Sequence, residues 1–496
     1  MSNVLAIDQG TSGTKAVVVC PERGVIASAT VDLRPRYGPA GEVEQDPQAL
    51  LDSVLDAGRR ALAAAGEPVI AVGLANQGET VLAWDPRTGT PLTPAIVWQD
   101  RRAAAICHDL ADDAGWLTDL TGLPLDPYFA APKLAWLRRT VTREGVVTTS
   151  DAWLVHRLTG EFVTDASTAS RTGLLDLDRT DWSPRAAQAY GLADERLPAV
   201  VDCAGQFGET TAFGPAARGG SGPALPLTGL VVDQQAALLA QHCLTAGAAK
   251  CTYGTGAFLL AQVGGLAPDP RAEAGRPGRA VRSAHGLPTS VAWRLAGASS
   301  YCLDGQVYTV ASAVRWLVEL GVLPAAVDLD RIAGAVPDAG GVVLVPALAG
   351  LAAPRWAADA RGAILGAHLG TTAGHLVRAL VDGIAGQVVD LAAAVAGDLG
   401  GPLTALRVDG GLTRSRVLMQ TQADLLQLPV EVSACPDATA LGAAALARVG
   451  ATPGLALADA VPAWTPAARY EPAISLDQAG TRLERLAAAV AVSQRW

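Results

Sequence analysis

Two short hairpins of the same kind stand half a chain apart. In the first, a turn rich in glycine and threonine at residues 8–14 joins two apolar strands. In the second, the turn at residues 254–256 does the same. Because the chain has 496 residues, one such hairpin opens each half. We therefore expect a duplicated α/β core, with two similar domains over residues 1–245 and 246–496.

The pattern around the hairpins also favours an α/β fold. Both glycine-rich turns lead into strands, which excludes the two common phosphate loops that open helices. Asp46 and Pro47 are typical of a helix start, and Gly66 is typical of its end. A buried strand at 69–74 follows. In the second half we expect a long helix at 373–395 and a strand at 403–408.

Composition narrows the class of protein. The net charge of −10 argues against a dedicated nucleic-acid binder, because phosphate backbones demand a basic surface. The N-terminus lacks the pattern of a signal peptide, and the longest uncharged apolar stretch, 339–354, is too short to span a bilayer. The seven cysteines are scattered, without the spacing of a disulfide framework or a zinc site. We expect a cytoplasmic protein with no membrane span.

Three aspartates follow apolar strands and could carry chemistry. Asp8 could serve Mg²⁺ through water, with the turn's backbone N–H groups and hydroxyls facing phosphate; an ordinary β-turn is the alternative. Asp233 could act as a base toward a hydroxyl or simply cap a helix. Asp409 precedes a pair of glycines that would allow close approach of a flat ligand, or a turn with positive φ. Lysine is scarce, and two of the three lysines, Lys15 and Lys250, adjoin the hairpins, which suggests that their chemistry retained them.

Taken together, the motifs resemble the FGGY carbohydrate kinases and, within that family, the glycerol kinases. The resemblance runs from about residue 4 to 447. It rests on segments in family order, among them DQGTSGTK (8–15), NQGETVLAWD (76–85), PAIVWQDRR (94–102), DPYFAAPKLAWL (126–137), TDASTASRTGLLDL (164–177), VDQQAALLAQ (232–241), TYGTGAFLL (252–260), VDGGLTRSRVLMQ (408–420) and DATALGAAALA (437–447).

The resemblance implies two actin-like, RNase H-type α/β domains with the active site in the cleft between them. It implies transfer of the ATP γ-phosphoryl group to a primary hydroxyl of a polyol, with glycerol as the expected acceptor and glycerol 3-phosphate as the product. Relatives of this kind are commonly homodimers or homotetramers. A catalytically silent actin-fold sugar sensor is a further alternative, and the presence of Asp233 argues against it.

The resemblance also assigns roles to residues. Asp233 would be the catalytic base, and Asp8 and Asp233 would position Mg²⁺. The acceptor would be bound by Glu79, Trp98, Tyr128, Asp233, Gln234 and Phe258. ATP would be bound by Thr11, Ser12, Gly13, Lys15, Gly254, Thr255, Ala311, Arg315, Gly410, Gly411 and Ser415. For Thr164, Ser167 and Arg171, helix capping and buried ion pairing are the favoured interpretation.

The sequence departs from the glycerol kinases at several of these positions. Gly78 stands where they carry an arginine directly before the glutamate. Either the acceptor is still glycerol, bound with another donor or a water, or it is a four- or five-carbon polyol or ketose, such as erythritol or xylulose, that fills the space. On the nucleotide side, Ala311, Arg315 and Ser415 replace the usual glycine, glutamine and asparagine, so those contacts differ in detail.

Overall fold

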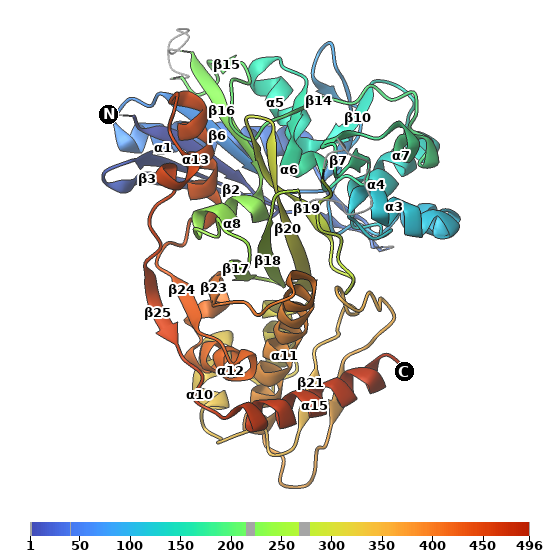
Figure 1. Ribbon diagram of the computed structural model, residues 1–496, viewed down its shortest axis with the longest axis vertical. Helices are drawn as coiled ribbons and strands as arrows, with labels where there is room; N and C mark the ends of the chain where they lie inside the picture. Colours follow the sequence, from blue (N-terminus) through green and yellow to red (C-terminus); the bar gives the residue numbers. More distant parts are fainter. Residues whose placement is uncertain (1, 40, 215–223, 267–277, 496) are drawn as a thin grey trace.

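The computed structural model describes residues 2–39, 41–214, 224–266 and 278–495. Two sheets of matching connectivity lie toward opposite ends of an elongated molecule (Figure 1). In the first sheet the strand order is β15-β16-β6-β1-β2-β3. Its strands are β1 (Val4–Gln9), β2 (Gly13–Cys20), β3 (Gly24–Asp32), β6 (Ala71–Asn76), β15 (Glu209–Thr210) and β16 (Leu225–Val232).

The second sheet repeats the connectivity of the first. Its order is β19-β20-β18-β17-β23-β24-β25. In each sheet an antiparallel hairpin leads the chain, and its first strand pairs in parallel with the next crossover strand. The expected duplicated α/β core is thus confirmed. The strands are β17 (Ala249–Tyr253), β18 (Ala257–Gly264), β19 (Thr289–Leu295), β20 (Ala298–Val307), β23 (Leu406–Asp409), β24 (Val430–Ser433) and β25 (Pro466–Tyr470).

Helices cover both faces of the first sheet. On one face α1 (Pro47–Ala65) packs against β1–β3; as expected, Asp46 caps its start and Gly66, at φ 63°, ends it. The other face is covered by α8 (Asp233–Ala240) and by α13 (Ala438–Ala451), which comes from the far end of the chain. A Cβ at Gly442 of α13 would lie 2.0 Å from the Ala236 carbonyl oxygen, so only glycine permits this packing.

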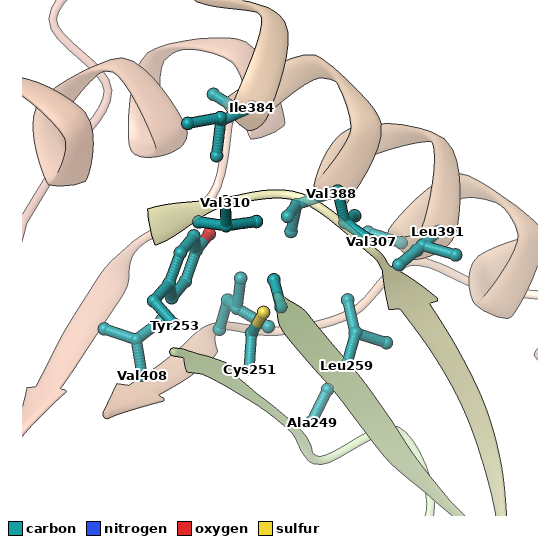
Figure 2. Packing of buried hydrophobic residues seen from close by; sticks show 14 of the residues in the cluster. Ala249, Cys251, Tyr253, Leu259, Val307, Val310, Ile384, Val388, Leu391 and Val408 are labelled. Atoms are coloured by element: carbon teal, nitrogen blue, oxygen red, sulfur yellow. The ribbon is translucent and has the colours of Figure 1, made fainter. Parts of the chain in front are cut away.

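The second sheet packs against a long helix, α11 (Ala373–Leu399). Figure 2 shows Ile384, Val388 and Leu391 of this helix above Cys251 and Tyr253 of β17. The helix is long and apolar enough to cross a membrane by length and composition alone, although 67% of its most apolar window is buried. Burial of this kind is what a core helix requires.

Smaller elements surround the two sheets. One further sheet in the first half contributes Tyr37 to the cavity described below, and Glu79 and Trp98 lie next to two of its strands. Its strands are β4 (Arg36–Tyr37), β5 (Val43–Gln45), β7 (Val81–Asp85), β8 (Thr90–Pro91), β9 (Ala95–Ile96) and β10 (Val146–Thr149). Two-stranded pairs are β11 (Val163–Asp165) with β14 (Ala199–Val201), β12 (Leu175–Asp176) with β13 (Asp181–Trp182), and β21 (Val343–Val345) with β22 (Ala363–Leu365). The other helices are α2 (Ala104–Asp109), α3 (Ala114–Thr121), α4 (Ala130–Trp136), α5 (Ser150–Thr159), α6 (Ala166–Ala169), α7 (Pro184–Ala189), α9 (Ala311–Glu319), α10 (Leu329–Ala333), α12 (Arg416–Leu426), α14 (Leu457–Ala460) and α15 (Leu476–Ser493).

Candidate active site

A cavity of about 370 Å³ opens between the two halves. This volume lies within the usual range of small-molecule sites. The first half contributes Thr11, Ser12, Pro35, Tyr37, Gly78, Glu79, Trp98, Gln99, Tyr128, Asp233 and Gln234 to its lining. The second half contributes Thr255, Gly256, Phe258, Val307, Tyr308 and Arg315. All six residues predicted for the acceptor line this cavity, together with Thr11, Ser12, Thr255 and Arg315 of the predicted nucleotide set.

Three aromatic rings form one wall of the cavity. Trp98 meets Tyr128 edge to face at 5.7 Å between ring centroids and meets Phe258 edge to face at 6.0 Å. The Trp98 indole N–H donates to the Thr11 hydroxyl at 2.8 Å, which fixes the plane of its ring. Apolar walls of this kind suit the carbon backbone of a polyol, whose hydroxyls need polar partners elsewhere.

Glu79 is held by a buried network of charges. Its backbone has a φ of 56°, a conformation that non-glycine residues seldom adopt. Its Oε1 atom accepts from Arg171 Nε at 2.7 Å, and Arg171 Nη1 donates to Asp304 at 2.7 Å. The guanidinium also lies 5.2 Å from the centre of the Phe129 ring. Burial raises the pKa of Glu79, and the positive charge of Arg171 opposes that shift.

The sequence left Arg171 and Asp304 out of the site. The expected buried ion pairing of Arg171 is confirmed, but its partners, 92 and 133 residues away, could not be inferred from spacing. The helix capping expected of Thr164 and Ser167 is supplied instead by Asp165, whose side chain accepts from the Ser167 and Thr168 N–H groups at the start of α6. The only signal in the sequence was that Arg171 lies in a segment typical of the family.

Asp233 and Asp8 are two half-buried acids that lie close enough for their charges to interact. Asp233 is the first residue of α8, where its Oδ1 atom accepts from the Gln234 backbone N–H at 2.7 Å. Burial raises the pKa of Asp233 to about 7, and the charge of Glu79 adds to the shift. Burial and the charge of Asp233 likewise raise the pKa of Asp8 to about 7, against the effect of Lys15. A cation placed between such acids would relieve their repulsion.

The two carboxylates suit a cation that takes most of its ligands from water and phosphate and only a few from the protein. Among the described residues there is no group of three or more His, Cys, Asp or Glu side chains arranged to hold a metal. Asp8 and Asp233 supply two hard carboxylates, which is the number that Mg²⁺ commonly takes from protein in phosphate-transfer sites. Water and phosphate oxygens would have to complete the shell.

The first hairpin turn is tied to the opposite end of the chain. Gly10 N–H donates to the Gly13 carbonyl across the turn at 3.0 Å, and Asp8 pairs in register with Lys15. The Lys15 ammonium forms an ion pair with Asp437, which precedes the first turn of α13. The resemblance placed Lys15 at phosphate, and nothing in the sequence indicated Asp437 as its partner.

The second hairpin turn packs at the start of α9. The Gly254 N–H donates to the Gly256 carbonyl at 2.8 Å, and the Thr255 carbonyl accepts from Val310 N–H at 2.9 Å. Ala311 and Arg315 stand on α9, and Arg315 reaches the cavity.

The remaining predicted nucleotide residues follow β23. Gly410 has a φ of 96°, and a Cβ there would lie 2.4 Å from the Tyr253 carbonyl. Ser415 caps α12 by accepting from the Leu418 N–H. Outside the cavity lining lie Asp8, Gly13, Lys15, Gly254, Ala311, Gly410, Gly411 and Ser415.

Comparison with known proteins gives consistent matches along the chain. Residues 3–240 match the FGGY family of carbohydrate kinases, N-terminal domain, and residues 249–451 match its C-terminal domain. A glycerol kinase of Thermus brockianus is 42% identical over 95% of this chain and 94% of its own length. A glycerol kinase of Aromatoleum aromaticum is 41% identical over 100% of this chain and 99% of its own.

Solved structures agree in fold. The crystal structure of Plasmodium falciparum glycerol kinase with ADP superimposes with a TM-score of 0.89 at 28% identity, covering 99% of this chain and 98% of that one. The crystal structure of xylulose kinase from Rhodospirillum rubrum gives a TM-score of 0.83 at 26% identity, with coverage of 99% and 98%.

Proposed function

The chain belongs to the FGGY family of carbohydrate kinases, and from that premise we propose that it transfers the γ-phosphoryl group of ATP to a primary hydroxyl of glycerol, giving glycerol 3-phosphate. The observation that carries the choice of acceptor is the likeness, at about 40% identity over nearly the full length, to proteins named glycerol kinase. The resemblance seen in the sequence is confirmed at the level of the family.

The acceptor pocket supports this proposal. Phosphoryl transfer asks the protein mainly to align the reactants and to stabilise charge. We assign the acceptor hydroxyls to Glu79, Tyr128 and Gln234, and its carbon backbone to Trp98 and Phe258. These five side chains line one cavity with the Asp233 carboxylate. Asp233 would take the proton of the attacking hydroxyl.

The donor side is proposed from the two hairpin turns. We assign the phosphates of ATP to Thr11, Ser12, Gly13, Lys15, Gly254 and Thr255. We assign the adenine and ribose to Ala311, Arg315, Gly410, Gly411 and Ser415. Asp8 and Asp233 would hold Mg²⁺ through water and phosphate oxygens. When bound, this ion supplies positive charge that screens the phosphate oxygens.

We also propose domains at 1–245 and 246–496, a homodimer or homotetramer, and a cytoplasmic location.

A longer acceptor is the second candidate, and Gly78 favours it. Gly78 carries no side chain and lines the cavity next to Glu79, although a Cβ there would pack tightly against Val232 Cγ2, at 3.0 Å. The Gln99 side chain also lines the cavity, and its buried Oε1 atom lacks a partner among the described residues. Both features leave room for one more carbon with a hydroxyl. Arg171 argues against a longer acceptor, because it already gives Glu79 a charged partner although position 78 carries no side chain.

Substrate-panel kinetics, coupled to ADP release, test the choice. We expect glycerol to have the highest kcat/KM among glycerol, erythritol and xylulose. A short acceptor that packs against the aromatic wall would have its primary hydroxyl best aligned with Asp233. Extra methylene groups in a pocket change selectivity by roughly 10–200-fold. A kcat/KM for glycerol roughly a hundredfold below that of another acceptor would identify the longer substrate instead.

The pH dependence of the reaction tests the acid pair. With the pKa of Asp233 near 7, the base form is lost as the pH falls, so kcat/KM should drop about tenfold per pH unit below about 7. Raising the Mg²⁺ concentration should shift this acidic fall in kcat/KM to lower pH, because a nearby cation favours the charged form of the carboxylates. A flat profile from pH 5.5 to 8 would contradict a carboxylate base whose pKa is raised to about 7.

A further inference from the structure

A buried lysine touches the proposed acceptor site from behind. Lys250 on β17 has no solvent exposure, and its Nζ atom donates to the Gln234 Oε1 atom at 2.6 Å. It also donates to the Thr252 hydroxyl at 2.9 Å. Gln234 itself lines the cavity, whereas Lys250 does not. The lysine therefore reaches the acceptor site only through the side chain of Gln234.

The contact fixes which end of the Gln234 amide faces the cavity. An ammonium group can only donate hydrogen bonds, so the amide must turn its oxygen toward Lys250. The Nε2 group is then directed away, and no described residue accepts a hydrogen bond from it. A glutamine free to rotate would offer the cavity either an acceptor or a donor. Here it offers a donor, which suits the lone pairs of a hydroxyl oxygen.

The same contact joins the two halves of the molecule. Gln234 stands on α8, which packs on the first sheet, and Lys250 stands on the first strand of the second sheet. That strand ends at Tyr253 and leads directly into the turn at Gly254, which we assign to phosphate. A lysine at this place therefore ties the acceptor amide to the strand that carries a phosphate turn.

Burying an ammonium group is costly unless carboxylates and hydrogen bonds compensate. Burial lowers the pKa of Lys250, and the charges of Asp409 and Asp233 oppose that shift. Thr252 and Gln234 provide its only hydrogen bonds among the described residues. Arginine is far commoner than lysine in this chain, so the lysine at this position stands out. A compact ammonium suits the short contact with a single amide oxygen better than a broad guanidinium does.

We propose that Lys250 is a positioning residue that sets the orientation of the Gln234 amide, so that the acceptor site presents a fixed N–H donor to one hydroxyl oxygen of the polyol. The proposal rests on the proposed function, because it takes a hydroxylated acceptor as the substrate. It adds a residue from the second half of the chain to the determinants of acceptor binding.

A double-mutant cycle tests the proposal. Lys250→Met and Gln234→Ala are made singly and together, and KM and kcat are measured with glycerol and ATP. We expect Lys250→Met to raise KM for glycerol about tenfold, the effect of one lost hydrogen bond, with KM for ATP unchanged. In the Gln234→Ala background the same substitution should change KM for glycerol by less than about twofold, because no amide remains to be oriented.

Arg407 offers a matched control. It pairs in register with Lys250 on the neighbouring strand, and it donates to the carbonyls of Gln241 and His242 at the far end of α8. Arg407→Met should leave KM for glycerol unchanged. An equal rise for Arg407→Met and Lys250→Met would overturn the proposal, because loosening of α8 would explain both.

Equal effects of Lys250→Met with and without Gln234 would also overturn the proposal, as would no effect in the wild-type background. Should Lys250→Met fail to fold, Lys250→Leu takes its place in the cycle, since it also removes the donor and has a smaller apolar side chain. If the unmodified protein prefers another polyol, the proposed acceptor is wrong; the cycle is then run with that polyol, so the two failures remain distinguishable.

Discussion

Asp233→Asn is expected to lower kcat for phosphoryl transfer to glycerol by about a thousandfold, with the affinity for ATP nearly unchanged. Asparagine matches the shape of aspartate, and its amide oxygen can still accept from the Gln234 N–H. It cannot take a proton from the acceptor hydroxyl. Single-turnover rates and a direct ATP binding measurement separate the loss of chemistry from a loss of binding.

The same substitution makes a second expectation about stability. A raised pKa means that folding disfavours the charged form, so the Asp233 carboxylate opposes folding above about pH 7 and does so less as the pH falls. Removing its charge should therefore keep or raise the thermal stability at pH 8. A variant that is inactive yet at least as stable as the parent has lost chemistry and not its fold.

Asp202→Asn is the matched control for Asp233→Asn. Asp202 lies in the same half of the chain as Asp233 and does not line the cavity, and it accepts from Arg294 of the second half at 2.6 Å. Its loss should leave kcat unchanged. Near-normal turnover by Asp233→Asn, or an equal loss in both variants, would refute Asp233 as the base.

Local signals allowed much of the fold to be predicted from sequence. The caps at Asp46 and Gly66 bound α1 as expected, and the two glycine-rich turns became hairpins at the heads of two sheets with matching connectivity. Cap and turn chemistry depends on neighbouring residues, which a single sequence displays. The location of α13 on the first sheet could not be foreseen, because it depends on packing across more than 200 residues.

In the site, too, some residues could be predicted from the sequence and others could not. The six residues that the motifs assign to the acceptor line one cavity: Glu79, Trp98, Tyr128, Asp233, Gln234 and Phe258. The motifs did not reveal what holds these residues, since hydrogen bonds from Arg171, Lys250 and Lys133 depend on the tertiary fold. Sequence motifs thus point to residues that face the cavity more readily than to residues that hold them in place.

The three lysines illustrate that difference. The sequence suggested a chemical reason for Lys15 and Lys250, and the structure adds Lys133 to this group. Lys133 has no solvent exposure, and its Nζ atom donates to three consecutive carbonyls, those of Pro127, Tyr128 and Phe129. It therefore holds the backbone of the segment that carries an aromatic wall of the cavity. All three lysines lie at or directly behind the site.

Arg171→Met is expected to lower the free energy of unfolding by about 3–5 kcal/mol and to raise KM for glycerol severalfold. The substitution leaves two buried carboxylates, Glu79 and Asp304, without their shared partner. Glu79 lines the cavity and Asp304 lies behind it. Repulsion between the two carboxylates should therefore displace Glu79 from the position in which it would bind an acceptor hydroxyl. Chemical denaturation gives the stability change, and steady-state kinetics give the change in KM.

A second substitution separates the two effects. Adding Asp304→Asn to Arg171→Met removes one of the unpaired charges, so part of the lost stability should return. Glycerol binding should not return, because Glu79 still lacks the Arg171 guanidinium that orients it at 2.7 Å. Arg294→Met, which removes a partly buried arginine paired with Asp202 outside the cavity, should cost stability without changing KM for glycerol. Recovery of both stability and glycerol binding in the double variant would mean that Arg171 serves the fold alone.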